Sequence, residues 1–157
     1  MKKILILAFI LYSMKLVGQV SNQLSEDSTD IYVFSFIEYC KAIKKHHTNT
    51  KSIYIWGKTF YSRVLPESVL DIKIERINDK LLHKLCNKKK YIFITEVIPL
   101  LNENNNFYVG IIPFKVTESK KGFNFENQGG INFNYSFNKD TGKFTFINSK
   151  GGIPVMK

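Results

Sequence analysis

The three histidines, His46, His47 and His83, are the residues of this chain best suited by type to bind a metal ion or transfer protons. Adjacent side chains on a helix or strand diverge, so His46 and His47 do not readily hold one ion. His83 and Cys86 lie three residues apart, a spacing that places two potential zinc ligands on one helix face. A zinc site requires three or four protein ligands, and the leucines around this pair indicate a packed helix instead. We therefore assign no metal ligand and no cofactor.

Catalysis by a nucleophile or by paired carboxylates has little support in the sequence. The chain contains no G-x-S-x-G motif. Glu96 is the one acid in the apolar segment 91–98, where a carboxyl group could serve glycoside hydrolysis. It alternates with its neighbours, however, and can equally face solvent at a sheet edge. The Gly129-Gly130 pair lacks the lysine and the helix of a phosphate-binding loop. The sequence therefore assigns no catalytic residue.

Cys40 and Cys86 are the only cysteines of the chain. In an exported protein, an even pair in an oxidising compartment favours a disulfide between the two helices that carry them. Both cysteines also lie in apolar stripes, and free cysteine is among the most often buried residue types. Two unpaired core thiols are therefore the alternative to the Cys40–Cys86 disulfide that we predict.

Positive charge is the clearest feature of the composition. The chain has 23 lysine and arginine residues against 13 aspartate and glutamate residues, and its formal net charge is +10 at pH 7. Arginine, whose planar guanidinium suits bidentate phosphate recognition, occurs only at Arg63 and Arg76. Lysines on separate loops act as diffuse charge, so we expect weak, non-specific contact with polyanions and no dedicated nucleic-acid partner. The expected contacts are Lys44, Lys45, Lys88, Lys89, Lys90, Lys120 and Lys121.

Residues 1–19 have the organisation of an export signal. Lys2 and Lys3 precede a largely apolar run over residues 4–14, and a polar boundary follows near Gln19. The run is too short to span a bilayer, which requires about 20 apolar residues. No cysteine adjoins the run, which argues against a lipid anchor. We predict a signal peptide, a secreted or periplasmic mature protein, and membrane contact only during export.

A helix is expected after a polar leader over residues 20–29. Apolar residues recur there at helical spacing, Thr29 or Asp30 can cap the start, and cations close the end, as the helix dipole favours. The stripe consists of Val33, Phe36, Ile37, Cys40 and Ile43. Leu81, Leu82 and Leu85 predict a second, short helix.

Strand patterns occupy most of the remaining chain. Residues 71–77 alternate between apolar and charged and 131–138 between apolar and polar, which is typical of antiparallel strands with one wet face. Proline cannot donate to a ladder, so Pro113 predicts a bulge or an outward-facing edge. Strands are predicted at 53–56, 71–77, 91–98, 107–116, 131–137 and 143–147.

The predicted fold class is therefore α+β. The N-terminal helix packs on a mostly antiparallel sheet of about five to six strands, accompanied by a short second helix. We expect these elements to form a single domain over residues 30–157.

Several short features together resemble uncharacterised small exported proteins of Bacteroidota. The resemblance implies export and covers most of the mature chain, but it implies no activity and no catalytic residue. Its features are Leu65-Pro66, the alternating segment 71–77, Pro113-Phe114, Gly129-Gly130 and Gly151-Gly152-Ile153, with Gln19 similar to the end of signals from those bacteria.

Three classes of function fit these features. The favoured hypothesis is a non-catalytic secreted or periplasmic module that binds an unknown protein or glycan, because catalysis requires convergent polar groups and none is evident. A small extracytoplasmic hydrolase is the first alternative. An inhibitor or immunity-type protein is the second, since one helix on a curved sheet is similar to a cystatin-like layout.

Overall fold

The computed structural model describes residues 31–104 and 106–153. The predicted signal peptide and polar leader lie outside the described residues. Within the described part, no helix is long and apolar enough to cross a membrane. The described helices are α2 (Ile31–His46), α3 (Phe60–Val64) and α4 (Asp79–Cys86).

The two predicted helices are present, and α3 is an addition. In α2, Phe36, Cys40 and Ile43 are buried as the spacing predicts, and basic residues occupy the last turn. The α4 helix begins after Asn78, whose side-chain oxygen accepts a hydrogen bond from the Leu81 backbone N–H at 2.9 Å. This bond satisfies a donor that a helix start otherwise leaves unpaired.

The predicted fold class is wrong, because the described sheet is mixed and has nine strands. β1 pairs in parallel with both β3 and β4, and the other pairs are antiparallel. The segments predicted as loops also hold three short strands, β2, β5 and β7. The strands are β1 (Ser52–Trp56), β2 (Ser68–Val69), β3 (Ile72–Ile77), β4 (Ile92–Val97), β5 (Leu101–Glu103), β6 (Asn106–Ser119), β7 (Gly122–Asn127), β8 (Gly130–Asn138) and β9 (Lys143–Gly152), in the order β2-β3-β1-β4-β6-β8-β9 with β5 and β7 also on β6.

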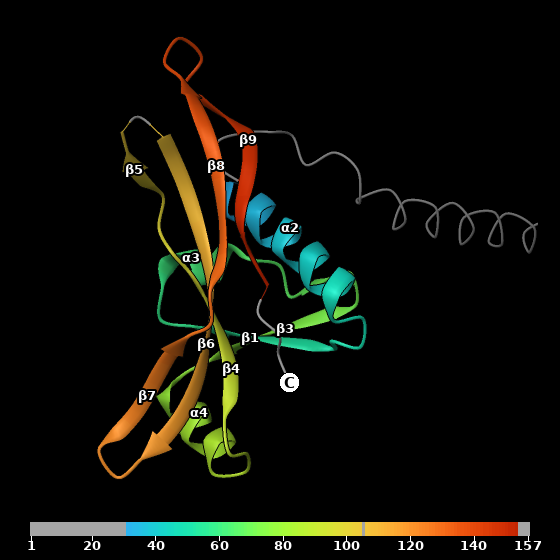
Figure 1. Cartoon of the computed structure of the whole chain (residues 1–157), viewed down its shortest axis with the longest axis vertical. Coiled ribbons are helices and arrows are strands. Elements are labelled where there is room, and N and C mark those ends of the chain that lie inside the picture. The colour runs from blue at the N-terminus through green and yellow to red at the C-terminus, as the bar shows by residue number, and fades with distance from the viewer. Residues whose placement is uncertain (1–30, 105, 154–157) are drawn as a thin grey trace, which may run out of the picture.

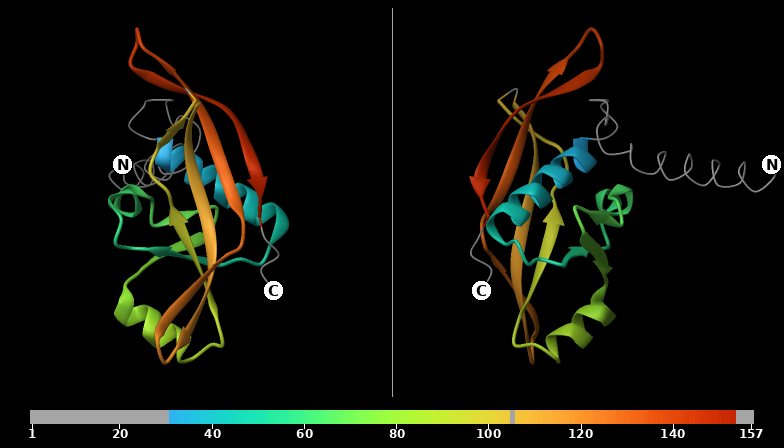
Figure 2. Two further views of the ribbon diagram at one scale, coloured as in Figure 1. Left: turned by 60° about the vertical axis from the view of Figure 1, so that its left-hand side comes forward. Right: turned by 90° about the vertical axis from the view of Figure 1, so that its right-hand side faces the viewer.

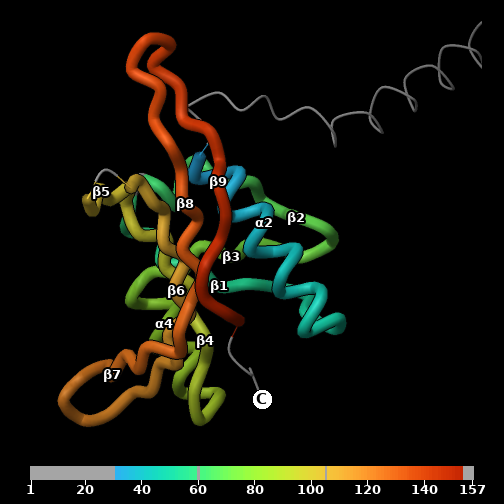
Figure 3. Tube along the Cα trace, turned by 45° about the horizontal axis from the view of Figure 1, so that its top comes forward, coloured from blue at the N-terminus to red at the C-terminus, as the bar shows by residue number. Residues whose placement is uncertain are grey.

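The long strand β6 organises the sheet, because each of its edges changes partner along its length. One edge pairs first with β5 and then with β4, and the other pairs first with β8 and then with β7. The sheet twists strongly along β6. In Figure 1, β5 and β8 lie left and right of its upper half, whereas β7 and β4 lie left and right of its lower half. Figure 3 shows β8 and β9 continuing past β6 as a hairpin.

Pro113 is fully buried inside β6, so the predicted bulge or outward-facing edge is wrong. Its position is tolerated because of the partner change. The Pro113 carbonyl accepts a hydrogen bond from the Gln128 N–H at 3.0 Å, in the connection between β7 and β8. In a strand, the N–H and C=O of one residue point to the same side. Pro113 therefore lacks its N–H on the edge where the β8 pairing ends at Ile111 and the β7 pairing begins at Phe114, and no partner strand requires a donor there.

The two longer helices, α2 and α4, cover opposite faces of the sheet, because the buried residues beneath them occupy alternate positions of the same strands. α2 packs on the face that carries Ile55, Val109 and Phe133, over the half of β6 that pairs with β8. α4 packs on the face that carries Ile94 and Val116, over the half that pairs with β4 and β7. Figure 2 shows the two helices at different heights along the sheet. This diagonal arrangement leaves part of each face without a helix packed across it. One hollow lies beside the C-terminal end of α2, and another lies on the face opposite α2.

Candidate functional site

The larger hollow lies where β1 and β4 separate. Among the described residues these two strands pair at one position only, Ile55 with Thr95, whereas β1 and β3 pair along the whole of β1. In Figure 1, β1 runs across the direction of β4 instead of alongside it. The amino-terminal parts of the two strands therefore diverge, and the C-terminal end of α2 lies above the gap. We name this hollow the split pocket.

The split pocket has a volume of about 650 Å³, which is within the usual range of about 300–1,000 Å³ for small-molecule sites. Aliphatic and aromatic side chains form most of its wall, with hydroxyl groups and cations among them. Its described lining is Tyr39, Ile43, His47, Thr50, Ser52, Ile53, Tyr54, Lys89, Lys90, Tyr91, Ile92, Phe93 and Thr95.

Tyr39 is the most unusual residue of this wall. Its side chain is fully buried, and its hydroxyl has no hydrogen-bond partner among the described residues. Burial raises the pKa of Tyr39 above its ordinary value, and the influence of the nearby Thr95 hydroxyl offsets only part of that effect. Thr95 is itself buried, but the two hydroxyls do not reach hydrogen-bonding geometry. The inner wall therefore contains one buried hydroxyl group, that of Tyr39, whose hydrogen bonding the described residues do not satisfy.

The open side of the split pocket is cationic. Lys89 and Lys90 are exposed, and His47, half-buried at the end of α2, lines the same hollow. No aspartate or glutamate is among the described lining residues. The charge of this rim favours an anionic ligand.

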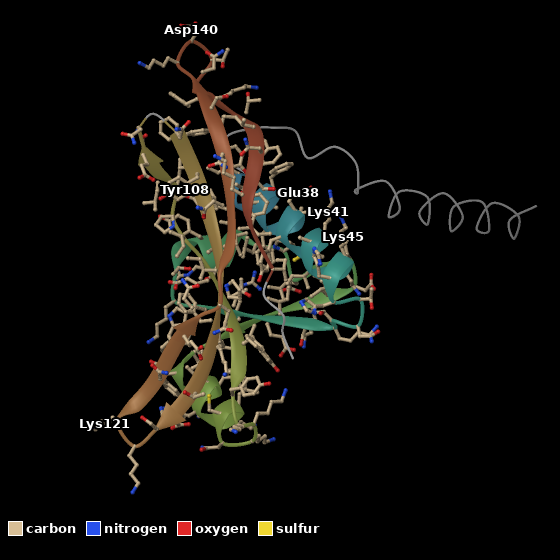
Figure 4. All side chains as sticks on the ribbon, in the orientation of Figure 1. Glu38, Lys41, Lys45, Tyr108, Lys121 and Asp140 are labelled. Carbon is tan, nitrogen blue, oxygen red and sulfur yellow. The ribbon has the colours of Figure 1, made fainter. Side chains whose placement is uncertain are left out.

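The structure separates the predicted polyanion contacts into two groups. Lys44 forms an ion pair with Asp71 at 3.2 Å, and Lys45 is exposed on α2. The segment Lys88–Lys90 and the β6–β7 turn with Lys120 and Lys121 lie toward the end of the molecule where Figure 4 labels Lys121, although Lys89 and Lys90 share the split pocket with Ile43 and His47 at the end of α2. Two of the predicted lysines, Lys89 and Lys90, thus belong to the split pocket.

The predicted Cys40–Cys86 disulfide is not formed in the structure, and both cysteines are free. Cys40 is buried in the core beneath α2, while Cys86 packs partly buried in the separate core beside α4. The two helices cover opposite sheet faces, so each thiol meets a different apolar cluster. Burial raises the pKa of Cys40 to about 12, as expected for an unreactive core thiol.

His83, Cys86 and Glu118 form the closest approach to a catalytic cluster. His83 Nδ1 lies 2.6 Å from Glu118 Oε1. Burial and the negative charge of Glu118 both raise the pKa of Cys86, which opposes formation of the nucleophilic thiolate. Within residues 31–104 and 106–153, no group of three or more His, Cys, Asp or Glu residues is arranged to hold a metal ion.

Glu96 and His46 are not among the described residues that line the split pocket. Glu96 is half-buried on β4 and pairs with Ile112, on the strand face opposite Thr95. His46 is exposed at the end of α2. Neither position provides support for the hydrolase hypothesis.

Sequence reasoning missed the residues that define the inner wall. Tyr39 lies four residues before Ile43 on the α2 stripe, and Thr95 is an inward-facing polar residue in an apolar strand. A polar group at a core position is the signal that could have identified both.

Comparisons with known proteins place no relative beside this chain: no family model, no curated protein and no solved structure matches it.

Proposed function

We propose that this chain is a non-catalytic, extracytoplasmic binding protein whose split pocket holds a small aromatic or cyclic acid. The carrying observation is the Tyr39 hydroxyl, buried without a partner among the described residues in the wall of a pocket of about 650 Å³. Leaving a buried hydroxyl unsatisfied costs about 1–3 kcal/mol. A polar ligand atom in contact with Tyr39 would recover that free energy. The extracytoplasmic location rests on the signal-like residues 1–19.

The lining specifies a ligand with two polar ends. Lys89 and Lys90 are exposed and mark the open side, where a carboxylate or phosphate group would gain charge-assisted hydrogen bonds. Tyr39 and Thr95 are buried and mark the inner wall, where a hydroxyl or carbonyl group of the ligand would bond. Aromatic side chains at Tyr91 and Phe93 favour a flat apolar body between the two ends.

A matched pair of probes tests this assignment. One is a hydroxynaphthoate with its hydroxyl at the end of the rings opposite the carboxylate, and the other is the naphthoate without that hydroxyl. Isothermal titration with both should show tighter binding of the hydroxylated acid. Tyr39→Phe should weaken it by about 2- to 10-fold and remove the preference, because a net hydrogen bond is worth about 0.5–1.5 kcal/mol.

Charge variants supply the control. The double variant Lys89→Gln with Lys90→Gln removes two charges at the pocket, and Lys120→Gln with Lys121→Gln removes two charges outside its described lining. Only the first should weaken naphthoate binding at constant salt. Absence of binding by both probes, or equal effects of the two double variants, would reject the proposed ligand class.

A further inference from the structure

The second uncovered part of the sheet holds a different kind of hollow, which we name the asparagine groove. It lies on the face opposite α2, over β5, β6, β8 and β9, and has a volume of about 310 Å³. Figure 4 labels Tyr108, one of its residues, on the side away from α2. The lining is Glu103, Asn104, Asn106, Tyr108, Asn132, Asn134, Ile147, Asn148 and Lys150.

Strand register produces the groove. Leu101 pairs with Tyr108, Tyr108 with Asn134, and Asn134 with Asn148, so one row of side chains crosses four strands. Asn132 and Lys150 are paired in the next row. On β8 the asparagines alternate with Ile131, Phe133 and Tyr135, which are buried beneath α2. The apolar core on one face therefore fixes the polar groups on the other.

The amides of this row are held in a defined arrangement. Asn134 Nδ2 donates a hydrogen bond to Asn148 Oδ1 at 2.8 Å. This bond uses one hydrogen of the Asn134 amide and the side-chain oxygen of Asn148, so Asn134 Oδ1 and Asn148 Nδ2 remain as an acceptor and a donor in the same row. Adjacent hydroxyls on a sugar ring each donate and accept, so they complement such a pair. The half-exposed ring of Tyr108 beside it can pack against the C–H groups of a sugar.

Charge distinguishes this groove from the rest of the molecule. The chain carries a formal net charge of +10, yet the groove holds one acid, Glu103, and one base, Lys150. A polyanion gains nothing from such a balanced site, whereas a neutral polyhydroxy ligand can bond to either group. The small volume, near the lower limit of about 300 Å³ for ligand sites, favours a short saccharide over a folded partner.

We infer that the asparagine groove is a binding site for a neutral oligosaccharide, separate from the split pocket. Nuclear magnetic resonance titrations of the labelled protein with maltotetraose, cellotetraose, mannotetraose and chitotetraose provide the test. At least one tetrasaccharide should shift the side-chain amide signals of Asn134 and Asn148 at millimolar concentration. Tyr108→Ala should weaken that binding tenfold or more.

Asn134→Asp is the second variant, because it keeps the shape of the side chain and replaces its donor with an acceptor. It should weaken binding at least threefold even if Tyr108→Ala fails to fold. Asn124→Ala changes an exposed asparagine on β7, outside the described lining, and should leave binding unchanged. The inference is overturned if none of the four sugars shifts the groove signals. It is equally overturned if Asn134→Asp binds like the unmodified protein, since the groove is then only a solvated sheet face.

Discussion

The Ser35 and Tyr135 hydroxyl oxygens lie 2.6 Å apart in a buried contact that joins α2 to β8. Tyr135 donates its hydroxyl proton to the Ile31 carbonyl oxygen at 3.2 Å. A tyrosine hydroxyl has one proton, so Ser35 must be the donor to Tyr135. The helix that carries Tyr39 is thus held to the sheet by an ordered pair of buried hydrogen bonds.

Removing the Tyr135 hydroxyl should cost more stability than removing that of Ser35. Tyr135→Phe leaves the buried Ser35 hydroxyl without this partner, and we expect a loss of about 1–3 kcal/mol. Ser35→Ala keeps the bond from Tyr135 to Ile31 and should cost about 0.5–1.5 kcal/mol. Urea unfolding measures both. In the double variant the two losses should not add, and simple additivity would contradict direct coupling of the pair.

Gly130 should be the glycine least tolerant of substitution at the β7–β8 connection. Its φ is +149°, and a Cβ there would lie 2.6 Å from the Ile111 carbonyl oxygen. Gly122 also has positive φ, +117°, but a Cβ there would meet no atom within 4 Å. Both alanine variants incur backbone strain of about 1–2 kcal/mol, and Gly130→Ala adds a steric clash. A larger fall in urea midpoint for Gly130→Ala is expected, and equal falls would refute the clash.

We expect a thiol titration of the denatured, non-reduced mature protein to find two free thiols. Cys40 and Cys86 are free and belong to different cores. In the native state the half-buried Cys86 should react with a thiol reagent before the buried Cys40 does. Finding no titratable thiol would restore the disulfide that the sequence suggested.

The parts of the fold that could be predicted are those in which one face is buried. The apolar stripe around Phe36 and the alternation in residues 71–77 each indicate an element with one buried face and one solvent-exposed face. The structure has the helix α2 and the strand β3 at these positions. β5 is exposed at all three residues and has no alternating hydrophobic pattern. β7 alternates only over Phe123–Glu126, and most of its residues are exposed, so this short pattern lies inside a segment that reads as a polar loop. The parallel pairing of β1 depends on how the chain crosses between strands, which side-chain periodicity does not encode.

Less of the candidate sites than of the fold could be predicted from the sequence. Tyr39 has the spacing of an ordinary core residue, and neither its missing partner nor the divergence of β1 and β4 before Ile55 and Thr95 is visible in that spacing. The sequence predicts Lys89 and Lys90 to act as diffuse charge, and only the tertiary structure places them at the split pocket. Local sequence identifies side-chain types, whereas strand divergence determines which of them share a hollow.

Stability should fall as the pH rises above about 9. Burial raises the pKa of Cys40 and of Tyr135, each to about 12, with the Ser35 hydrogen bond partly opposing the shift of Tyr135. The native state then keeps protons that the unfolded chain releases, so this stabilisation is complete below the unfolded pKa values and lost as the pH approaches 12. Each group contributes a slope of up to about 1.4 kcal/mol per pH unit.

Cys40→Ala isolates one of these contributions. Its cavity lowers stability at every pH, but the decline in unfolding free energy between pH 9 and 12 should be shallower than in the unmodified protein. Urea titrations at several pH values provide the measurement. An unchanged slope would show that Cys40 does not retain its proton through burial.

Heparin binding should be weak, sensitive to salt and concentrated at one end of the molecule. Lys88–Lys90 and the turn with Lys120 and Lys121 lie at the same end, while Lys44 is partly neutralised by Asp71 at 3.2 Å. Binding that neutralises several sulfates should weaken about tenfold or more between 50 and 200 mM salt. Replacing Lys120 and Lys121 by glutamine should weaken heparin binding more than replacing Lys44 and Lys45, because Lys44 is already paired with Asp71. The two double variants are matched, since each removes two charges. Titration calorimetry at two salt concentrations distinguishes the outcomes: equal losses would mean that net charge alone governs binding, and persistence at high salt would require a specific anion site.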